Sequence, residues 1–148
     1  THAAGPSATG DAALDAALPL PERYEIPDAT ARAVNAAHRR GGRVIAIGTT
    51  VVRALEAYAT AAFGEVRAGQ GIASLVLTPS HELRVVDGIV SGIHDPTESH
   101  FRLLGAFADA RTLGLASERA AREELNRHEL GDATLVLPGA LAAARRAA

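Results

Sequence analysis

The sequence of 148 residues predicts an α/β domain with a mixed, partly parallel sheet flanked by helices. Residues 43–48 form a short apolar run that ends at a glycine, which is typical of a strand buried on both faces. Helical patterns precede and follow this run within a few residues. A helix, a strand, a tight turn and a second helix in succession favour parallel strand pairing.

The composition fits one globular domain. Apolar residues make up 47% of the chain and charged residues 22%, with a net charge of −2. No stretch approaches the ~20 apolar residues of a membrane-spanning helix, and residues 1–17 lack the pattern of a secretory signal. The absence of Cys excludes disulfides and favours the cytoplasm. A segment that binds nucleic acid by itself is expected to have an excess of basic residues, and this one does not.

Two further absences concern Met and Lys. Because the sequence has no initiator Met, we expect it to be a segment of a larger protein. Because all 15 basic residues are Arg, a Schiff-base or general-base lysine is excluded for this segment.

Turn residues and apolar periodicity predict the elements in order. We expect residues 1–27 to be mostly loop and the Ala-rich tail 139–148 to be helical at best. The predicted helices cover residues 28–40, 49–62 and 117–126. Another helix is predicted to begin at Asp95, because Asp95, Pro96 and Glu98 are spaced as at a helix start. The predicted strands cover residues 43–48, 74–78, 83–86, 89–93 and 134–137, and Gly64, Gly69 and Gly71 predict a loop before the second of these strands.

The first candidate site is the turn Gly48-Thr49-Thr50. It lies between a strand end and a helix start, where open α/β sheets bind ligands. The glycine permits close backbone approach, the hydroxyls donate or accept, and Arg53 follows about one helical turn later. This pattern suits an anionic or ribose-bearing ligand, although a threonine-capped helix is also a common structural feature. We expect Glu56 to pair with Arg53 across one turn.

The second candidate site surrounds His94. Asp95, Glu98 and His100 follow within seven residues, but their spacing argues against a metal centre. His94 lies between a strand and a helix start, where it can act as an acid or base near neutral pH. A polar loop histidine is the alternative. The sequence contains no nucleophile elbow, dinucleotide-binding glycine motif or phosphate-loop lysine.

Five fragments in a fixed order carry a resemblance to a known family. They are residues 22–27, 42–56, 85–88, His94 with Pro96, and 131–133. Over about residues 22–137 the sequence resembles the S-adenosylmethionine:tRNA ribosyltransferase-isomerase family of queuosine biosynthesis. His2 matches more loosely the histidine of the family's Leu-His-Val-Gly strand.

The resemblance implies a larger protein, with an α/β domain that carries an inserted β-barrel domain. Residues 1–148 would be the C-terminal part of the α/β domain, without the N-terminal part and the barrel. The implied reaction moves the ribosyl part of S-adenosylmethionine onto a deazaguanine base of tRNA in the cytoplasm, giving epoxyqueuosine and releasing adenine and methionine. The donor is then a substrate, the partner is tRNA, and no metal or membrane is involved.

Such a site must bind ribose hydroxyls, hold a sulfonium cation and provide a base for the proton beside sulfur. The resemblance and the residue chemistry assign His94 and Asp87 to catalysis. They assign substrate binding to Gly48, Thr49, Thr50, Arg53 and Asp132.

The sequence departs from the family pattern at several positions where the family carries aromatic, basic or polar groups. These positions are Leu20, Arg23, Ile72, Gly92, Thr97 and Leu130. Groups of the missing kinds stack on bases and contact phosphate, so these departures affect the tRNA step more than donor binding. Two alternatives follow: a relative that uses S-adenosylmethionine with another acceptor, or a non-catalytic member whose motifs serve folding.

Overall fold

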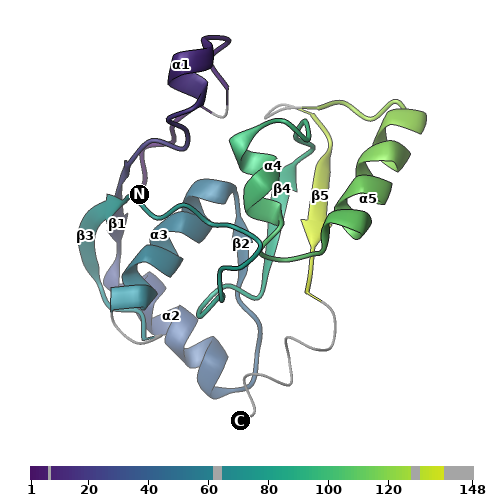
Figure 1. Cartoon of the computed structure of the whole chain (residues 1–148). Helices are drawn as coiled ribbons and strands as arrows, with labels where there is room; N and C mark the ends of the chain where they lie inside the picture. The colour runs from purple at the N-terminus through teal and green to yellow at the C-terminus, as the bar shows by residue number, and fades with distance from the viewer. Residues whose placement is uncertain (7, 62–64, 128–130, 139–148) are drawn as a thin grey trace.

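The computed structural model describes residues 1–6, 8–61, 65–127 and 131–138, and two sheets flank one central helix in it (Figure 1). The strands are β1 (Glu22–Ile26), β2 (Ile45–Ile47), β3 (Gly69–Ala73), β4 (Gly88–Gly92) and β5 (Ala133–Val136). β1 and β3 form an antiparallel ribbon, and the second sheet has the order β2-β4-β5. β2 runs parallel to β4 and β5 runs antiparallel to it, so the predicted mixed α/β architecture is confirmed.

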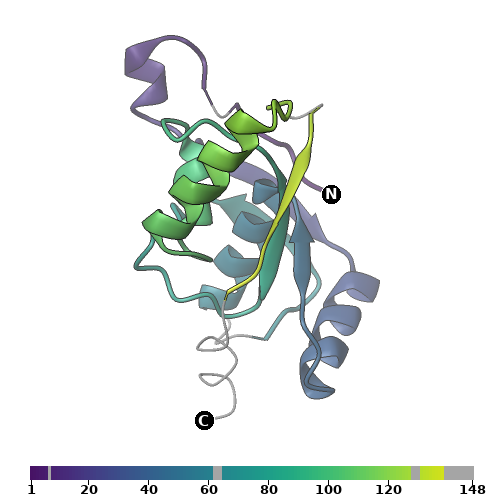
Figure 2. The same ribbon diagram turned by 90° about the vertical axis from the view of Figure 1, so that its right-hand side faces the viewer.

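The helices position these two sheets. They are α1 (Ala12–Asp15), α2 (Asp28–Arg39), α3 (Thr49–Ala61), α4 (Ser99–Leu104) and α5 (Ala110–Arg122). α3 contacts both the β1–β3 ribbon and the β2-β4-β5 sheet, and α4 and α5 lie beside the second sheet (Figures 1 and 2). The expected helix after residue 28, the expected helix after Gly48 and the strands β2, β4 and β5 are confirmed. Among the described residues, no helix has the length and apolarity to cross a membrane.

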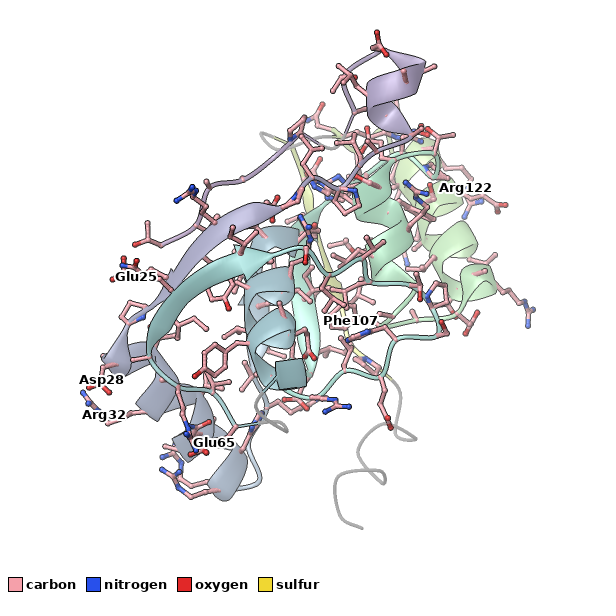
Figure 3. The ribbon with its side chains drawn as sticks, turned by 60° about the vertical axis from the view of Figure 1, so that its left-hand side comes forward. Glu25, Asp28, Arg32, Glu65, Phe107 and Arg122 are labelled. Carbon is pink, nitrogen blue, oxygen red and sulfur yellow. The ribbon has the colours of Figure 1, made fainter. Side chains whose placement is uncertain are left out.

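The core lies between α3 and the second sheet. Val52 and Leu55 of α3 pack in one buried cluster with Ala46, Ile89 and Phe107. Each large apolar side chain buried in this way contributes about 1.5–3 kcal/mol to folding. Phe107 points into the interior in Figure 3, whereas the labelled charged side chains project outward.

The opposite face of the second sheet is open. The sequence predicted a β2 buried on both faces, and this is wrong, because Ile47 is 76% exposed and Leu135 of β5 is 56% exposed. The side chains alternate along β2, so Ala46 faces the helices and Ile45 and Ile47 face away from them. The apolar run therefore identified the strand but not the number of covered faces.

The β1–β3 ribbon was not predicted. Residues 1–27 were expected to be mostly loop, but they contain α1 and β1, and His2 forms a β-bridge with Tyr24. β3 lies at 69–73, where glycines suggested a loop, and residues 74–78 are not a strand. A Cβ atom on Gly71 would lie 2.6 Å from the Tyr24 hydroxyl oxygen. Gly71 therefore makes room for a side chain of the paired strand, and does not mark a loop.

Residues 83–86 were predicted as a strand and are not one. Their amides donate to the carboxylate of Glu56 in α3, with distances of 2.9, 2.9 and 2.8 Å from the nitrogens of Arg84, Val85 and Val86. The expected pairing of Glu56 with Arg53 is therefore wrong. Glu56 is completely buried and fastens this segment to α3 in place of a neighbouring strand.

The last two helices begin at positions other than those predicted. The Asp95 carboxylate caps a turn by accepting from the Thr97 amide at 3.0 Å, and α4 starts only at Ser99. α5 begins at Ala110, where the Asp109 carboxylate accepts from the Thr112 amide at 2.8 Å. The predicted helix over 117–126 therefore covered only the second half of α5. The predicted tail lies outside the described residues.

We predict that Glu56→Ala lowers the free energy of unfolding by about 3–5 kcal/mol, because it leaves buried amides without an acceptor. Glu56→Gln should lose less, since its one carbonyl oxygen still accepts from Val85 and Val86. Urea unfolding measures both values, with Glu82→Ala at an exposed position as the control. Equal stability of Glu56→Ala and the control would contradict the prediction.

Candidate functional site

Four of the predicted site positions meet at one edge of the β2-β4-β5 sheet, here called the carboxyl edge. Parallel β2 and β4 both end there, because Ile47 pairs with Val90, and β5 begins there, because Gly92 pairs with Ala133. The positions that flank these strand ends are Gly48, Thr49, His94 and Asp132, and Thr50 follows in the first turn of α3. Ligands of open α/β sheets bind at such an edge.

Asp87 lies at the opposite end of β4. It precedes this strand and His94 follows it, so the six residues between them, in mostly extended chain, separate the two by roughly 20 Å. The Asp87 carboxylate accepts from the Val44 amide at 2.7 Å, and the His38 ring nitrogen is 3.8 Å away. The structure therefore does not bring the two predicted catalytic residues together. The contacts of Asp87 hold Val44, the residue before β2.

The turn into α3 depends on Gly48 and Glu22. Gly48 has φ +92°, a conformation that favours glycine, and its amide donates to the Val90 carbonyl at 2.8 Å. Thr49 and Thr50 are buried, and the Thr50 hydroxyl lies 3.5 Å from the Glu22 carboxylate. The Gly5 amide donates to the same carboxylate at 2.9 Å. Sequence reasoning did not single out Glu22, because its partners are distant in the chain.

Arg53 is only 1% exposed and serves the interior. Its Nε donates to the Leu75 carbonyl at 3.1 Å, and one terminal nitrogen donates to Leu20 and Ala73 at 2.8 and 3.0 Å. The other terminal nitrogen forms an ion pair with Glu22 at 2.8 Å. Burial lowers the pKa of Arg53, and the Glu22 carboxylate opposes this shift. Arg53 thus joins α3 to the β1–β3 ribbon.

His94 is held between two buried side chains. Its Nε2 lies 2.8 Å from the Ser91 hydroxyl oxygen, and its Nδ1 lies 3.4 Å from the Glu98 carboxylate. The ring of His100 meets that of His94 edge to face, with centroids 5.0 Å apart. A hydroxyl, an imidazole and a carboxylate in series can hold and move a proton. No local pattern indicates Ser91, because only the end of β4 places it beside His94.

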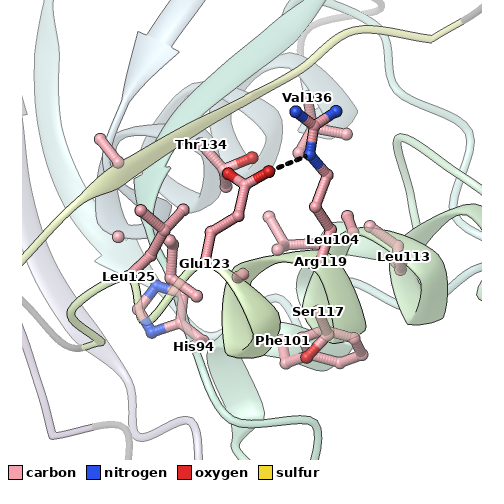
Figure 4. Close-up of a pocket in the computed structure, with 15 residues that line it drawn as sticks. His94, Phe101, Leu104, Leu113, Ser117, Arg119, Glu123, Leu125, Thr134 and Val136 are labelled. Atoms are coloured by element: carbon pink, nitrogen blue, oxygen red, sulfur yellow. Dashed lines mark hydrogen bonds and ion pairs between the residues drawn. The ribbon is translucent and has the colours of Figure 1, made fainter.

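Cavities flank the histidine pair. One, of about 250 Å³, is lined by His94 and lies between α4, α5 and the ends of β4 and β5 (Figure 4). Another, of about 300 Å³, is lined by His100, Arg53 and Ser99. Among the described residues, no group of three His, Asp or Glu side chains could hold a metal ion.

Asp132 organises the loop that precedes β5. Its carboxylate accepts from the Asn126 amide at 2.8 Å, and its own amide donates to the Asn126 carbonyl at 3.0 Å. Gly131 is required beside it, because a Cβ atom there would lie 2.5 Å from that carbonyl oxygen. Asp132 remains exposed at the carboxyl edge.

We predict that Arg53→Ala destabilises the fold by about 3–5 kcal/mol, because it leaves the Glu22 carboxylate buried without its partner. The double variant Glu22→Gln with Arg53→Met should lose less stability than the sum of the losses of Glu22→Gln alone and Arg53→Met alone. Chemical unfolding of the four proteins gives the coupling energy. If the losses of stability are additive, the ion pair does not hold α3 against the ribbon.

Comparison with known proteins identifies a family for this chain. Residues 11–136 match the family model described as queuosine biosynthesis protein. The S-adenosylmethionine:tRNA ribosyltransferase-isomerase of Geobacter sulfurreducens is 41% identical over 115 residues, which are 78% of this chain and 33% of the relative. The enzyme of the same name from Thiobacillus denitrificans is 40% identical over 112 residues, 76% of this chain and 32% of the relative.

A solved structure is also similar. The crystal structure of S-adenosylmethionine tRNA ribosyltransferase from Thermotoga maritima matches with a TM-score of 0.69 and 30% identity, over 78% of this chain and 41% of that one. The chain spans about a third of the length of the curated relatives it matches. By sequence over most of its length and by fold, the chain belongs to the queuosine biosynthesis protein family.

Proposed function

We propose that this chain is part of an enzyme that transfers and isomerises the ribosyl moiety of S-adenosylmethionine onto a deazaguanine base in tRNA. The identity of about 40% to relatives that carry this enzyme's name supports the proposal. The observation that carries it is the gathering of Gly48, Thr49, Thr50, His94 and Asp132 at the carboxyl edge.

The donor's ribose is proposed to lie against the turn at Gly48. A ligand can approach this turn closely because Gly48 has no side chain, and the Thr49 hydroxyl beside it suits a ribose hydroxyl. The Thr50 hydroxyl, 3.5 Å from the Glu22 carboxylate, is proposed to bind the ribose from the same turn when it exchanges that long contact. Arg53 contributes to this binding site by its ion pair with Glu22, which holds α3 against the ribbon, since its other nitrogens already donate to main-chain carbonyls. Asp132 is proposed to bind substrate from the start of β5.

His94 is the proposed proton-transfer residue. With its Nδ1–H directed at Glu98, the His94 ring accepts from the Ser91 hydroxyl at Nε2. The Ser91 oxygen would take the proton from the carbon beside the donor's sulfur as its own hydroxyl proton passes to Nε2 of His94, and Glu98 would stabilise the resulting imidazolium ion. Asp87 has no part in this proposal, because β4 separates it from His94.

The remaining parts of the proposal concern the setting of the reaction. The proposed steps use no metal, and the proposed location is the cytoplasm, because the proposed substrate is tRNA. With a net charge of −2 this chain offers little attraction for phosphate, so the rest of the longer protein is proposed to supply most of the tRNA contacts.

A different acceptor is the second candidate. Leu20, Ile72 and Thr97, three of the positions that differ from the family pattern, are exposed and are therefore accessible to an acceptor. The aliphatic side chains of Leu20 and Ile72 stack on bases less well than aromatic ones. The donor half of the proposal is the same in both candidates.

We predict that the full-length protein releases adenine from S-adenosylmethionine only when tRNA bearing the deazaguanine precursor is present. Chromatographic detection of adenine measures this, with unmodified tRNA as the control. Donor binding without adenine release would favour a different acceptor. The absence of donor binding at millimolar concentration would refute both candidates.

We predict that His94→Ala lowers kcat by about 10²–10⁴-fold and leaves donor affinity nearly unchanged, since general acid–base catalysis contributes on this scale. Asp87→Asn should lower stability without a comparable loss of turnover, because its carboxylate holds the Val44 amide. Single-turnover rates and calorimetric donor titration separate the two effects. Equal losses of kcat in both variants would count against the proposed role of His94.

A further inference from the structure

A mainly apolar cavity lies beside His94. It has α4 and α5 on one side and the ends of β4 and β5 on the other (Figure 4). Phe101, Leu104, Leu113 and Val136 give it apolar walls. We propose that this cavity binds a purine-type heterocycle, an inference that rests on the function proposed above.

The volume of the cavity limits its occupant. At about 250 Å³ it is smaller than the roughly 300–1,000 Å³ of pockets for drug-sized ligands. A single bicyclic ring fits this volume, whereas a whole nucleoside with its methionine chain does not. The sugar of an occupant would extend out of the cavity toward the carboxyl edge, where the Gly48 turn lies.

The lining suits the two surfaces of such a ring. Apolar walls and the aromatic ring of Phe101 complement its faces, and stacking of a base on an aromatic side chain is sequence-tolerant and favourable. The hydroxyls of Ser117 and Thr134 offer donors and acceptors for its polar edge. Glu123 adds a carboxylate on the rim, where it pairs with Arg119 at 2.8 Å (Figure 4).

His94 connects the cavity to the proposed chemistry. It lines the cavity, and Ser91 and Glu98 fix its ring. A heterocycle bound here would therefore have the proton-transfer residue at its side. Two rings in the proposed reaction share this chemistry, the adenine of the donor and the deazaguanine of the acceptor, and the experiment distinguishes them.

The test compares Ala120→Leu with Ala121→Leu in the full-length protein. Ala120 is buried and lines the cavity, whereas its neighbour Ala121 is exposed and does not. Calorimetry with two probes, S-adenosylmethionine and the free base 7-aminomethyl-7-deazaguanine, measures affinity. We expect Ala120→Leu to weaken one probe at least about tenfold, because the added methyl groups occupy the space of the ring. We expect Ala121→Leu to weaken neither.

The outcome also identifies the ring. Loss of S-adenosylmethionine binding assigns the cavity to adenine, and loss of the free base assigns it to deazaguanine. Unchanged affinity for both probes in a folded Ala120→Leu protein overturns the inference. If that variant does not fold, Ala116→Leu at the exposed rim and Thr134→Val provide the same comparison.

Failure of the proposed function has a different result. A wild-type protein that binds neither the donor nor precursor tRNA refutes the function itself. A wild-type protein that releases adenine while the cavity variants keep full affinity for both probes refutes only the assignment of the cavity.

Discussion

The buried ion pair between Arg53 and Glu22 joins the two sheets of this protein through α3. Arg53 comes from the helix, Glu22 from β1, and the carbonyls that the guanidinium binds come from β3 and the segments beside the ribbon. A buried charge is costly unless its partners are fixed, so this arrangement ties α3 to the ribbon in one orientation. Through Thr50, the same pair defines the wall of the turn at Gly48.

A second buried carboxylate has the corresponding role on the other side of α3. Glu56 lies one turn after Arg53 and accepts amides from 84–86, just before β4. Thus α3 contacts the ribbon through the Arg53 guanidinium, and it contacts the segment before β4 through the Glu56 carboxylate. The Glu56 contacts hold the segment that leads into β4, and β4 in turn runs from there to the carboxyl edge.

The chemistry proposed for the carboxyl edge depends on which side chains β4 brings together and which it keeps apart. β4 places Ser91 and His94 at the carboxyl edge and Asp87 at its far end. Two residues that are close in sequence therefore have unrelated environments. His94 lines one mainly apolar cavity and His100 lines another, and the two rings meet edge to face between them.

Local sequence determined the elements whose signals are short in range. The helix after Asp28, the strand around Ala46, the turn at Gly48 and the strand after Gly88 follow from periodicity, glycine conformation and turn chemistry. The same local pattern placed a candidate site at the Gly48 turn. These features depend on interactions within a few residues, so they can be predicted from sequence.

Tertiary structure decided everything that depends on distant partners. Glycines at 69 and 71 suggested a loop, yet Tyr24 makes Gly71 part of a strand, and Glu56 prevents 83–86 from becoming one. The roles of Arg53, Ser91 and Asp87 were decided in the same way, because burial and strand ends determine which groups each side chain reaches. Sequence spacing specifies neighbours along the chain, whereas a site is formed by neighbours in space, and the packing of α3 between two sheets selects them.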